Sequence, residues 1–235
     1  MLLSKVFNLA EAWGLRQDRT NPCSRVKRFP ENKRRRYLSP AELARLGGAL
    51  RIAERGELRG ASWQTIAFVW FAILTGMRSG EVKGLRWDNV DVLRGVATLP
   101  STKSGFREVQ LAAPALEVLA GLPRLEGSPF VLPAAKGDGH FVGTFKGWDA
   151  IRKAAGIEDV HAHDLRHSFA SVGAGGGASL PIIGALLGHS NPSTTARYAH
   201  LADDPLRAAS DAIGERISAA LEGDAAPVLQ LGRVR

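Results

Sequence analysis

The sequence predicts an α+β fold that is mainly α-helical and carries one small antiparallel sheet. Apolar residues recur at helical spacing along most of the chain, whereas only Gly95 to Leu99 and Arg107 to Leu111 alternate as strands do. The polar stretch between these two segments has the composition of a hairpin tip, and Phe130 to Leu132 is a candidate third strand. At 235 residues, of which 45% are hydrophobic, the chain is long enough to bury a core.

The first part of the chain is expected to lie outside the main domain. Residues 1–14 contain one amphipathic helix, Leu2 to Trp13, which ends before a glycine. Residues 15–37 show little periodicity and are rich in arginine, which indicates a basic linker; a solvated, partly disordered segment is the alternative. The sequence SPAE at residues 39–42 is typical of a capping box with proline at the first helical position. The main domain should therefore span residues 38–222.

The remaining helices follow from apolar periodicity and from the glycines and prolines that interrupt it. They are expected at Ala61 to Leu74, Arg78 to Leu85, Pro114 to Ala120, Phe141 to Ala155, His163 to Val172, Leu180 to Leu187 and Pro205 to Leu221. The glycines at residues 173–177 lack the GxxxxGK[ST] pattern, so they indicate a turn between helices and not a phosphate-binding loop. Residues 223–235 are expected to form a loose tail.

Composition restricts the function classes. The formal net charge is +8, which favours a polyanionic partner such as nucleic acid. Because Cys23 is the only cysteine, no intrachain disulfide can form, and a reducing cytoplasm is the expected location. The longest apolar run, Ile66 to Leu74, has about half of the roughly 20 residues that a membrane span needs, so no membrane partner is expected.

Three motifs carry residues that could perform chemistry. The first is TGMRSGEV at residues 75–82, where one arginine follows a glycine break at the start of a helix. The second is HDLRHSFAS at residues 163–171, where the first histidine shares a helix face with the arginine three residues on and the histidine four residues on. The third is LGHSNPSTTARYAHL at residues 187–201, where a tyrosine follows a histidine by nine residues. Taken singly, each motif could be structural.

In this order, the three motifs resemble the conserved boxes of the tyrosine recombinase family, the phage integrases and their relatives, over about Ser39 to Leu221. The resemblance implies an integrase-type catalytic domain with a small three-stranded antiparallel sheet. It implies site-specific DNA recombination, the integration or excision of a mobile element, through a 3′-phosphotyrosyl intermediate. It further implies no ATP, metal or other cofactor. The implied partners are a double-stranded DNA attachment site and, from a monomer in solution, a homotetramer on recombining DNA.

The resemblance also assigns roles residue by residue. The implied catalytic residues are Arg78, Lys103, His163, Arg166, His189 and Tyr198, with Glu81 and His167 as neighbours that support them. Arginine forks suit the anionic phosphate and its more highly charged transition state. Tyr198 would attack, and because a phenol has a pKa of about 10, it needs a base, for which His163 is the expectation. Lys103, at the hairpin tip, would protonate the leaving 5′ oxygen.

DNA contacts are expected from Arg34, Arg35 and Arg36 in the linker and from Lys103. Three further basic residues are left open between a DNA contact and an ordinary exposed charge: Arg86, Arg107 and Lys146. In the family, a helical core-binding domain precedes the catalytic domain, and Leu2 to Trp13 resembles only its last helix. Weak cleavage is therefore expected, with recombination only when the missing part is present.

Three other functions remain as alternatives. A non-recombining DNA-binding remnant would follow from the short N-terminal part. A type IB topoisomerase has similar chemistry but relaxes supercoils, and the motif spacing is closer to that of integrases. A metallohydrolase would use HDLRH as a variant of HExxH with His161 as a third ligand, but the guanidinium of Arg166 would repel the metal cation.

Overall fold

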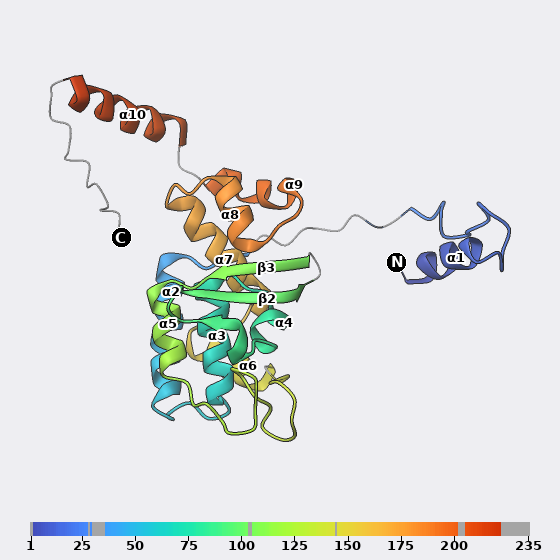
Figure 1. Cartoon of the computed structure of the whole chain (residues 1–235), viewed down its shortest axis with the longest axis horizontal. Helices are drawn as coiled ribbons and strands as arrows, with labels where there is room; N and C mark the ends of the chain where they lie inside the picture. The colour runs from blue at the N-terminus through green and yellow to red at the C-terminus, as the bar shows by residue number, and fades with distance from the viewer. Residues whose placement is uncertain are drawn as a thin grey trace, which may run out of the picture. The chain divides into compact units, whose positions relative to one another are not determined.

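The computed structural model describes residues 2–27, 29, 36–102, 105–143, 145–201 and 205–221. The chain divides into two compact units, Met1–Arg35 and Arg36–Arg235 (Figure 1). Among the described residues, no helix is both long enough and apolar enough to cross a membrane.

The first unit contains helix α1 (Leu2–Ala12), close to the predicted bounds. Asn21, in the segment that follows the helix, is buried and donates from its amide nitrogen to the carbonyl oxygen of Ser4 at 3.0 Å and to Oδ1 of Asn8 at 2.5 Å. These bonds hold the following segment against the helix. Several apolar side chains of α1, including Leu2 and Leu3, are exposed within the chain.

The second unit is built mainly of helices. Its α-helices are α2 (Pro40–Glu54), α3 (Trp63–Thr75), α4 (Ser79–Lys83), α5 (Ala113–Ala120), α6 (Phe145–Ala154), α7 (Ala162–Gly175), α8 (Leu180–Leu187), α9 (Pro192–Thr195) and α10 (Pro205–Leu221), with 3-10 helices η1 (Trp87–Asn89) and η2 (Ala196–Leu201). The predicted capping box is present at the start of α2, where the side chains of Ser39 and Glu42 bond each other's backbone nitrogens. Local sequence signals thus fix where this helix begins.

The sheet has three antiparallel strands in the order β1 (Val90–Asp91), β2 (Val96–Thr102) and β3 (Gly105–Gln110). The β2–β3 hairpin was predicted, and Leu99 lies opposite Arg107 in its register. The third strand is β1, which was not predicted, whereas the candidate short strand Phe130 to Leu132 forms only an isolated bridge between Phe130 and Arg86. The backbone around Phe130 instead pairs with the segment after α4, through Val131 N to Leu85 O at 2.8 Å.

Helix α6 begins at Phe145, four residues after the predicted start at Phe141. The physical reason is a competing backbone interaction. Phe141 donates from its nitrogen to the carbonyl oxygen of Leu132 at 2.7 Å, and His140 forms a bridge with Pro133. Residues 140–141 are therefore extended and paired, and they cannot join the helix.

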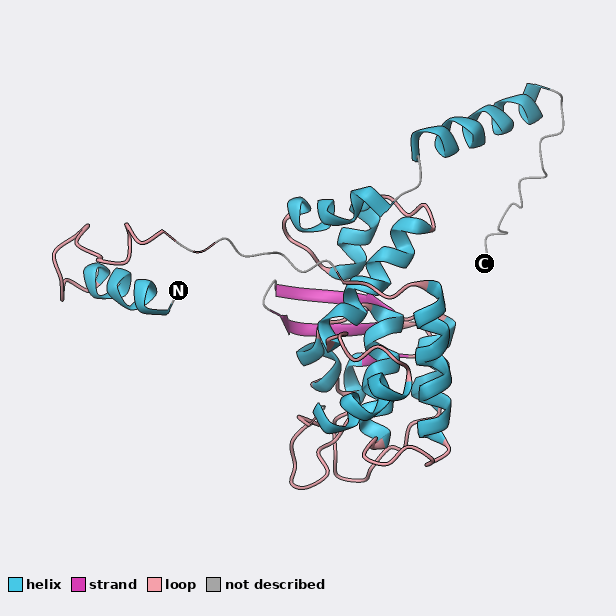
Figure 2. Ribbon diagram, turned by 180° about the vertical axis from the view of Figure 1, so that it is seen from behind, coloured by secondary structure: helices cyan, strands magenta, loops and turns pink. Residues whose placement is uncertain are grey.

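Two clusters of buried apolar side chains hold the second unit together. The larger one surrounds α3, whose Phe68 and Phe71 are fully buried. The smaller one consists of Ala170, Ala174, Ile183, Leu187 and Tyr198, from α7, α8 and η2. Figures 1 and 2 show α8 and α9 at one end of this unit and the loops between α5 and α6 at the opposite end.

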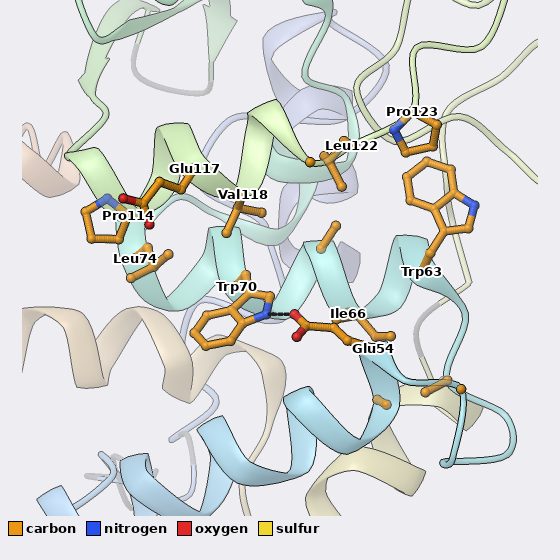
Figure 3. A pocket seen from close by; sticks show the side chains of 15 residues that line it. Glu54, Trp63, Ile66, Trp70, Leu74, Pro114, Glu117, Val118, Leu122 and Pro123 are labelled. Atoms are coloured by element: carbon orange, nitrogen blue, oxygen red, sulfur yellow. Dashed lines mark hydrogen bonds between the residues drawn. The ribbon is translucent and has the colours of Figure 1, made fainter.

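An apolar groove of about 730 Å³ lies between α2, α3 and α5 (Figure 3). Trp63, Trp70 and Leu122 line it, and Trp70 donates from Nε1 to Oε1 of Glu54 at 2.7 Å. None of the residues that line this groove belongs to the three motifs. The candidate chemistry therefore lies elsewhere in the fold.

Candidate active site

Arg78 is placed by a helix start, as its motif predicts. It is the residue before α4, and its backbone nitrogen donates to Oε2 of Glu81 at 2.9 Å. Its Nη1 donates to Oε1 of the same carboxylate at 2.7 Å, and its Nη2 donates to the carbonyl oxygen of Gly188 at 3.3 Å. The side chain is 33% exposed. One part of the fork is therefore anchored while another part is open to a ligand.

Arg166 is buried in α7, with 4% of its surface exposed. Its Nη1 donates to the carbonyl oxygen of Gly76 at 2.6 Å, and its Nη2 donates to that of Leu187 at 2.7 Å. These carbonyls lie at the C-terminal ends of α3 and α8, where the helix dipole is negative. Burial, followed by repulsion from neighbouring arginines, lowers the pKa of Arg166 to about 10, so the group stays cationic at neutral pH.

A third guanidinium, that of Arg107 on β3, lies in the same place. Its Nη1 donates to the carbonyl oxygen of Leu187 at 2.6 Å and lies 3.5 Å from Oε2 of Glu81. Only 8% of Arg107 is exposed, so of the two alternatives left open for this residue, that of an ordinary exposed charge is wrong. Strand alternation was the available signal, because Arg107 shares a face with the buried Val109.

Two glycines allow close packing at the helix ends whose carbonyls hold the arginines. Gly188 ends α8 at φ +66°, and a Cβ atom there would overlap the side chain of Arg107. Gly76 ends α3 at φ +63°, and a Cβ there would come within 2.6 Å of the ring of Phe169. Both positions combine a left-handed backbone with missing space, which explains why each motif needs glycine there.

Tyr198 lies on η2 and is buried. Its hydroxyl is 2.5 Å from Nδ1 of His167, and the His167 ring meets the ring of His163 edge to face at 4.8 Å between centroids. His163 was expected to be the partner of the phenol, whereas the structure places His167 in contact with it. His167 is therefore a site residue whose contact with the tyrosine was not predicted.

Burial sets the protonation of this group. It raises the pKa of Tyr198, lowers that of His163, and lowers that of His167 to about 4. Positive charge on nearby arginines adds to the lowering for both histidines. At neutral pH the phenol is protonated and both rings are neutral, so the phenol can donate its hydrogen bond to Nδ1 of His167.

His189 follows the glycine that ends α8. Its Nδ1 is 2.9 Å from Oγ1 of Thr195, a buried hydroxyl at the end of α9. Burial and, after it, the positive charge of four nearby arginines lower the pKa of His189 to about 4. If Thr195 donates to Nδ1, the proton of the neutral ring lies on Nε2 and is available to a ligand. Thr195 was not predicted; its only sequence signal is its place within the third motif.

The remaining predicted site residues divide into two groups. Lys103, Arg34 and Arg35 lie outside the described residues. Arg36, for which a DNA contact stays a prediction, bonds Glu42 and Asp159, with Nη2 to Oε1 of Glu42 at 2.7 Å and Nε to Oδ2 of Asp159 at 2.7 Å. This ion pair lowers the pKa of Glu42 to about 2.

The metallohydrolase alternative requires a cluster of metal ligands. Within the described part of the chain, no three side chains of His, Cys, Asp or Glu come together in a metal-binding arrangement. The histidines of HDLRH contact each other and Tyr198 instead. The arrangement of these side chains therefore gives the metallohydrolase alternative no support.

Guanidinium forks beside a protonated tyrosine are the arrangement expected of an enzyme that transfers phosphoryl groups through that tyrosine. Residues 36–204 match the profile described as the phage integrase family, and the chain belongs to this family. It is 34% identical over 208 residues to a shufflon-specific DNA recombinase from Escherichia coli. The matched region covers 85% of this chain and 49% of that protein. It is 30% identical over 207 residues to a tyrosine recombinase from Thermosipho africanus, and this match covers 86% of this chain and 69% of that protein.

Solved structures show the same fold. XerA recombinase superimposes with a TM-score of 0.58 at 24% identity, over 87% of this chain and 71% of that one. XerH recombinase, in a post-cleavage complex with its palindromic difH substrate, gives a TM-score of 0.60 at 23% identity, over 76% of this chain and 53% of that one. These likenesses confirm the predicted integrase-type fold. The chain spans about half the length of the Escherichia coli relative, so the activity of whole recombinases is carried to this chain only as a proposal.

Proposed function

We propose that this chain cleaves and rejoins DNA in site-specific recombination, and that Tyr198 forms the 3′-phosphotyrosyl intermediate. The observation that carries the proposal is the contact between the Tyr198 hydroxyl and the neutral ring of His167, which lies on α7 one residue after Arg166. A type IB topoisomerase would use similar chemistry. The two relatives above are named as recombinases, which favours recombination.

The arginines supply charge compensation. A phosphodiester carries one negative charge, and attack by an oxygen adds charge to the phosphorus centre in the transition state. Arg78 and Arg166 would each bind a non-bridging oxygen, and His189 would donate a further hydrogen bond from Nε2. Because their anchors are already in place, little reorganisation is needed when DNA binds.

The proton of the attacking phenol goes to a neutral histidine. His167 already contacts the hydroxyl, so it takes the proton as the O–P bond forms, and His163 serves as a polar neighbour of the phosphate. The bond from phosphorus to the 5′ oxygen then breaks. Lys103 is proposed to protonate this leaving oxygen, as the resemblance implies.

A nicked suicide substrate tests the proposal. Cleavage of such a DNA releases a short fragment, so the covalent adduct accumulates and is seen on a denaturing gel. Tyr198→Phe should abolish the adduct, whereas Phe at Tyr37, the other of the two tyrosines in the chain, should leave it unchanged. An adduct that persists in Tyr198→Phe would show that another residue is the nucleophile.

The two histidines can be separated by their pH profiles. Without a base, cleavage depends on phenolate, so in His167→Ala the rate should rise about tenfold per pH unit from pH 7 to 9, below the phenol pKa. His163→Ala should be slower than the original protein but keep its flatter profile. A steep profile in His163→Ala alone would return the role of base to His163.

The role of Lys103 has its own test. A 5′-bridging sulfur leaves without protonation, so Lys103→Ala should slow cleavage of the ordinary substrate and leave the sulfur substrate near the original rate. Lys136, in the loop between α5 and α6, is a matched lysine whose replacement by alanine should change neither rate. Equal loss on both substrates would remove the general-acid role.

We further propose that the partner is a double-stranded attachment site in the cytoplasm, and that the protein is a monomer that forms a homotetramer on recombining DNA. The net charge of +8 supports an anionic partner. Light scattering after gel filtration measures the mass of the protein alone and with DNA. A tetramer in the absence of DNA would contradict the expected order of assembly.

A further inference from the structure

Arg107 lies between the anchors of the two arginines proposed to bind phosphate. Its Nη1 donates to the carbonyl oxygen of Leu187, which also accepts from Nη2 of Arg166. The same nitrogen lies 3.5 Å from Oε2 of Glu81, whose other oxygen accepts from Arg78. One nitrogen atom therefore links the acceptor that holds Arg78 to the acceptor that holds Arg166.

The other two nitrogens of the Arg107 guanidinium, unlike Nη1, make no hydrogen bond to the described residues. Both of these atoms, Nε and Nη2, are buried. Burial lowers the pKa of Arg107, so the surroundings disfavour its charge. Buried donors without a partner are uncommon in proteins and call for an explanation. Because these atoms are inaccessible, a direct contact with the DNA phosphate does not supply one.

We propose that Arg107 is a positioning residue for strand cleavage, which sets the spacing between Glu81 and the end of α8 and so aims the Arg78 and Arg166 forks at one phosphate. This inference rests on the proposed function of the site. Arg107 comes from β3, whereas its partners come from α4 and α8, so it fixes the sheet to both helices. Its side chain also fills the space next to Gly188 that a Cβ atom would need.

If Arg107 is a positioning residue, its replacement should slow the cleavage step and leave DNA affinity unchanged. Arg107 is buried, so its removal should leave the DNA-facing charge largely intact. Misplacing the forks, in contrast, weakens the stabilisation of charge that develops during cleavage. The defect should therefore depend on the charge of the phosphate that is attacked.

The test compares Arg107→Met and Arg107→Lys with the original protein in single-turnover cleavage. One substrate has an ordinary phosphodiester, and the other has a methylphosphonate, in which a methyl group replaces a charged non-bridging oxygen. Arg107→Met should lose about 100-fold on the phosphodiester, the order expected when reacting groups are misplaced. On the methylphosphonate it should stay within about threefold of the original protein, because less charge needs compensation.

Lysine keeps the charge without the planar fork, so Arg107→Lys should recover less than about a tenth of the lost rate. Arg94→Met is the matched control, since Arg94 also faces a carboxylate of β3, Glu108 at 3.7 Å, but is 63% exposed. The Arg94→Met substitution also removes one positive charge, and the variant should cleave both substrates at the rates of the original protein.

Three outcomes would overturn the proposal. They are equal loss on the two substrates by Arg107→Met, unchanged cleavage of the phosphodiester, and full recovery in Arg107→Lys. Failure of the proposed function gives a different result, because the original protein would then form no adduct with either substrate. Thermal unfolding shows whether each variant is folded; if Arg107→Met is not, the same comparison is made with Arg107→Lys, and equal loss on the two substrates by the folded variant overturns the proposal.

Discussion

At Gly188 the backbone passes against the side chain of Arg107 and leaves no room for a Cβ atom. The same residue has φ +66°, which L side chains rarely adopt. The glycine of the LGH motif is thus explained by its left-handed backbone and by the space that the side chain of Arg107 occupies.

Gly188→Ala should lower both stability and cleavage. Left-handed strain in a non-glycine residue costs about 1 to 2 kcal/mol, and the overlap with Arg107 adds to it. Gly177→Ala is the matched control, because Gly177 has φ +82° but nothing within 4 Å of its Cβ position. Urea unfolding should show a loss for both variants, whereas the suicide substrate should show slower cleavage only for Gly188→Ala. Normal cleavage by Gly188→Ala would show that the Arg107 contact is dispensable.

The buried histidines make stability depend on pH. The pKa values of His167 and His189 fall from 6.5 to about 4, so between these limits the unfolded chain binds more protons than the folded one. Stability should therefore decrease as pH falls from about 6.5 towards 4. Urea midpoints at pH 7 and pH 4.5 measure this difference.

Replacing a site histidine by a group that does not titrate should reduce that difference. His167→Gln is expected to show a smaller fall in midpoint between pH 7 and pH 4.5 than the original protein. His200→Gln, at an exposed position, serves as the control and should keep the original fall. An identical fall in both variants would mean that His167 is not the source.

At the scale of elements, long periodic segments were predictable and short ones were not. Helix α8 has the predicted bounds, Leu180–Leu187, because its apolar residues repeat and a proline and a glycine bound it. Strand β1 has two residues and α9 has four, so neither is long enough to show a period. Tyr198 lies on a 3-10 helix, whose geometry depends on hydrogen bonding that the sequence pattern does not specify.

The candidate site was predictable in composition but not in its connections. The motifs identified Arg78, Arg166 and Tyr198, since each lies within a distinctive local pattern. Arg107 was missed as a site residue because burying a guanidinium depends on acceptors brought from α4 and α8. The choice between His163 and His167 as the neighbour of Tyr198 depends on how η2 packs against α7.

The ion pairs of Arg36 join the start of α2 to the segment before α7. Arg36→Met should lower the free energy of unfolding by about 1 kcal/mol, the upper end for partly exposed pairs. Arg55→Met, which breaks an exposed pair with Glu57, should have no measurable effect. The salt dependence of DNA binding should be the same for both variants. A smaller salt dependence for Arg36→Met would instead indicate a phosphate contact.

At the scale of the whole molecule, we expect charge to govern the proposed encounter with DNA. The 31 lysines and arginines exceed the 23 acidic residues by 8. Affinity for duplex DNA should therefore fall steeply with salt, with a log–log slope of about −0.9 for each phosphate neutralised. Fluorescence anisotropy from 50 to 200 mM salt, a range of the order used for such proteins, measures this slope. A flat response would contradict an electrostatic interface.

The second unit keeps Tyr198, the proposed nucleophile, away from its main core. Tyr198 belongs to the small cluster with Ile183 and Leu187, and it lies on a 3-10 helix, whose hydrogen bonds are poorer than those of an α-helix. Segments with small cores can open without global unfolding. Amide protons of residues 196–201 should therefore exchange with solvent sooner than those of α3. The protein could then withdraw its tyrosine by a local opening while the rest of the domain stays folded on DNA.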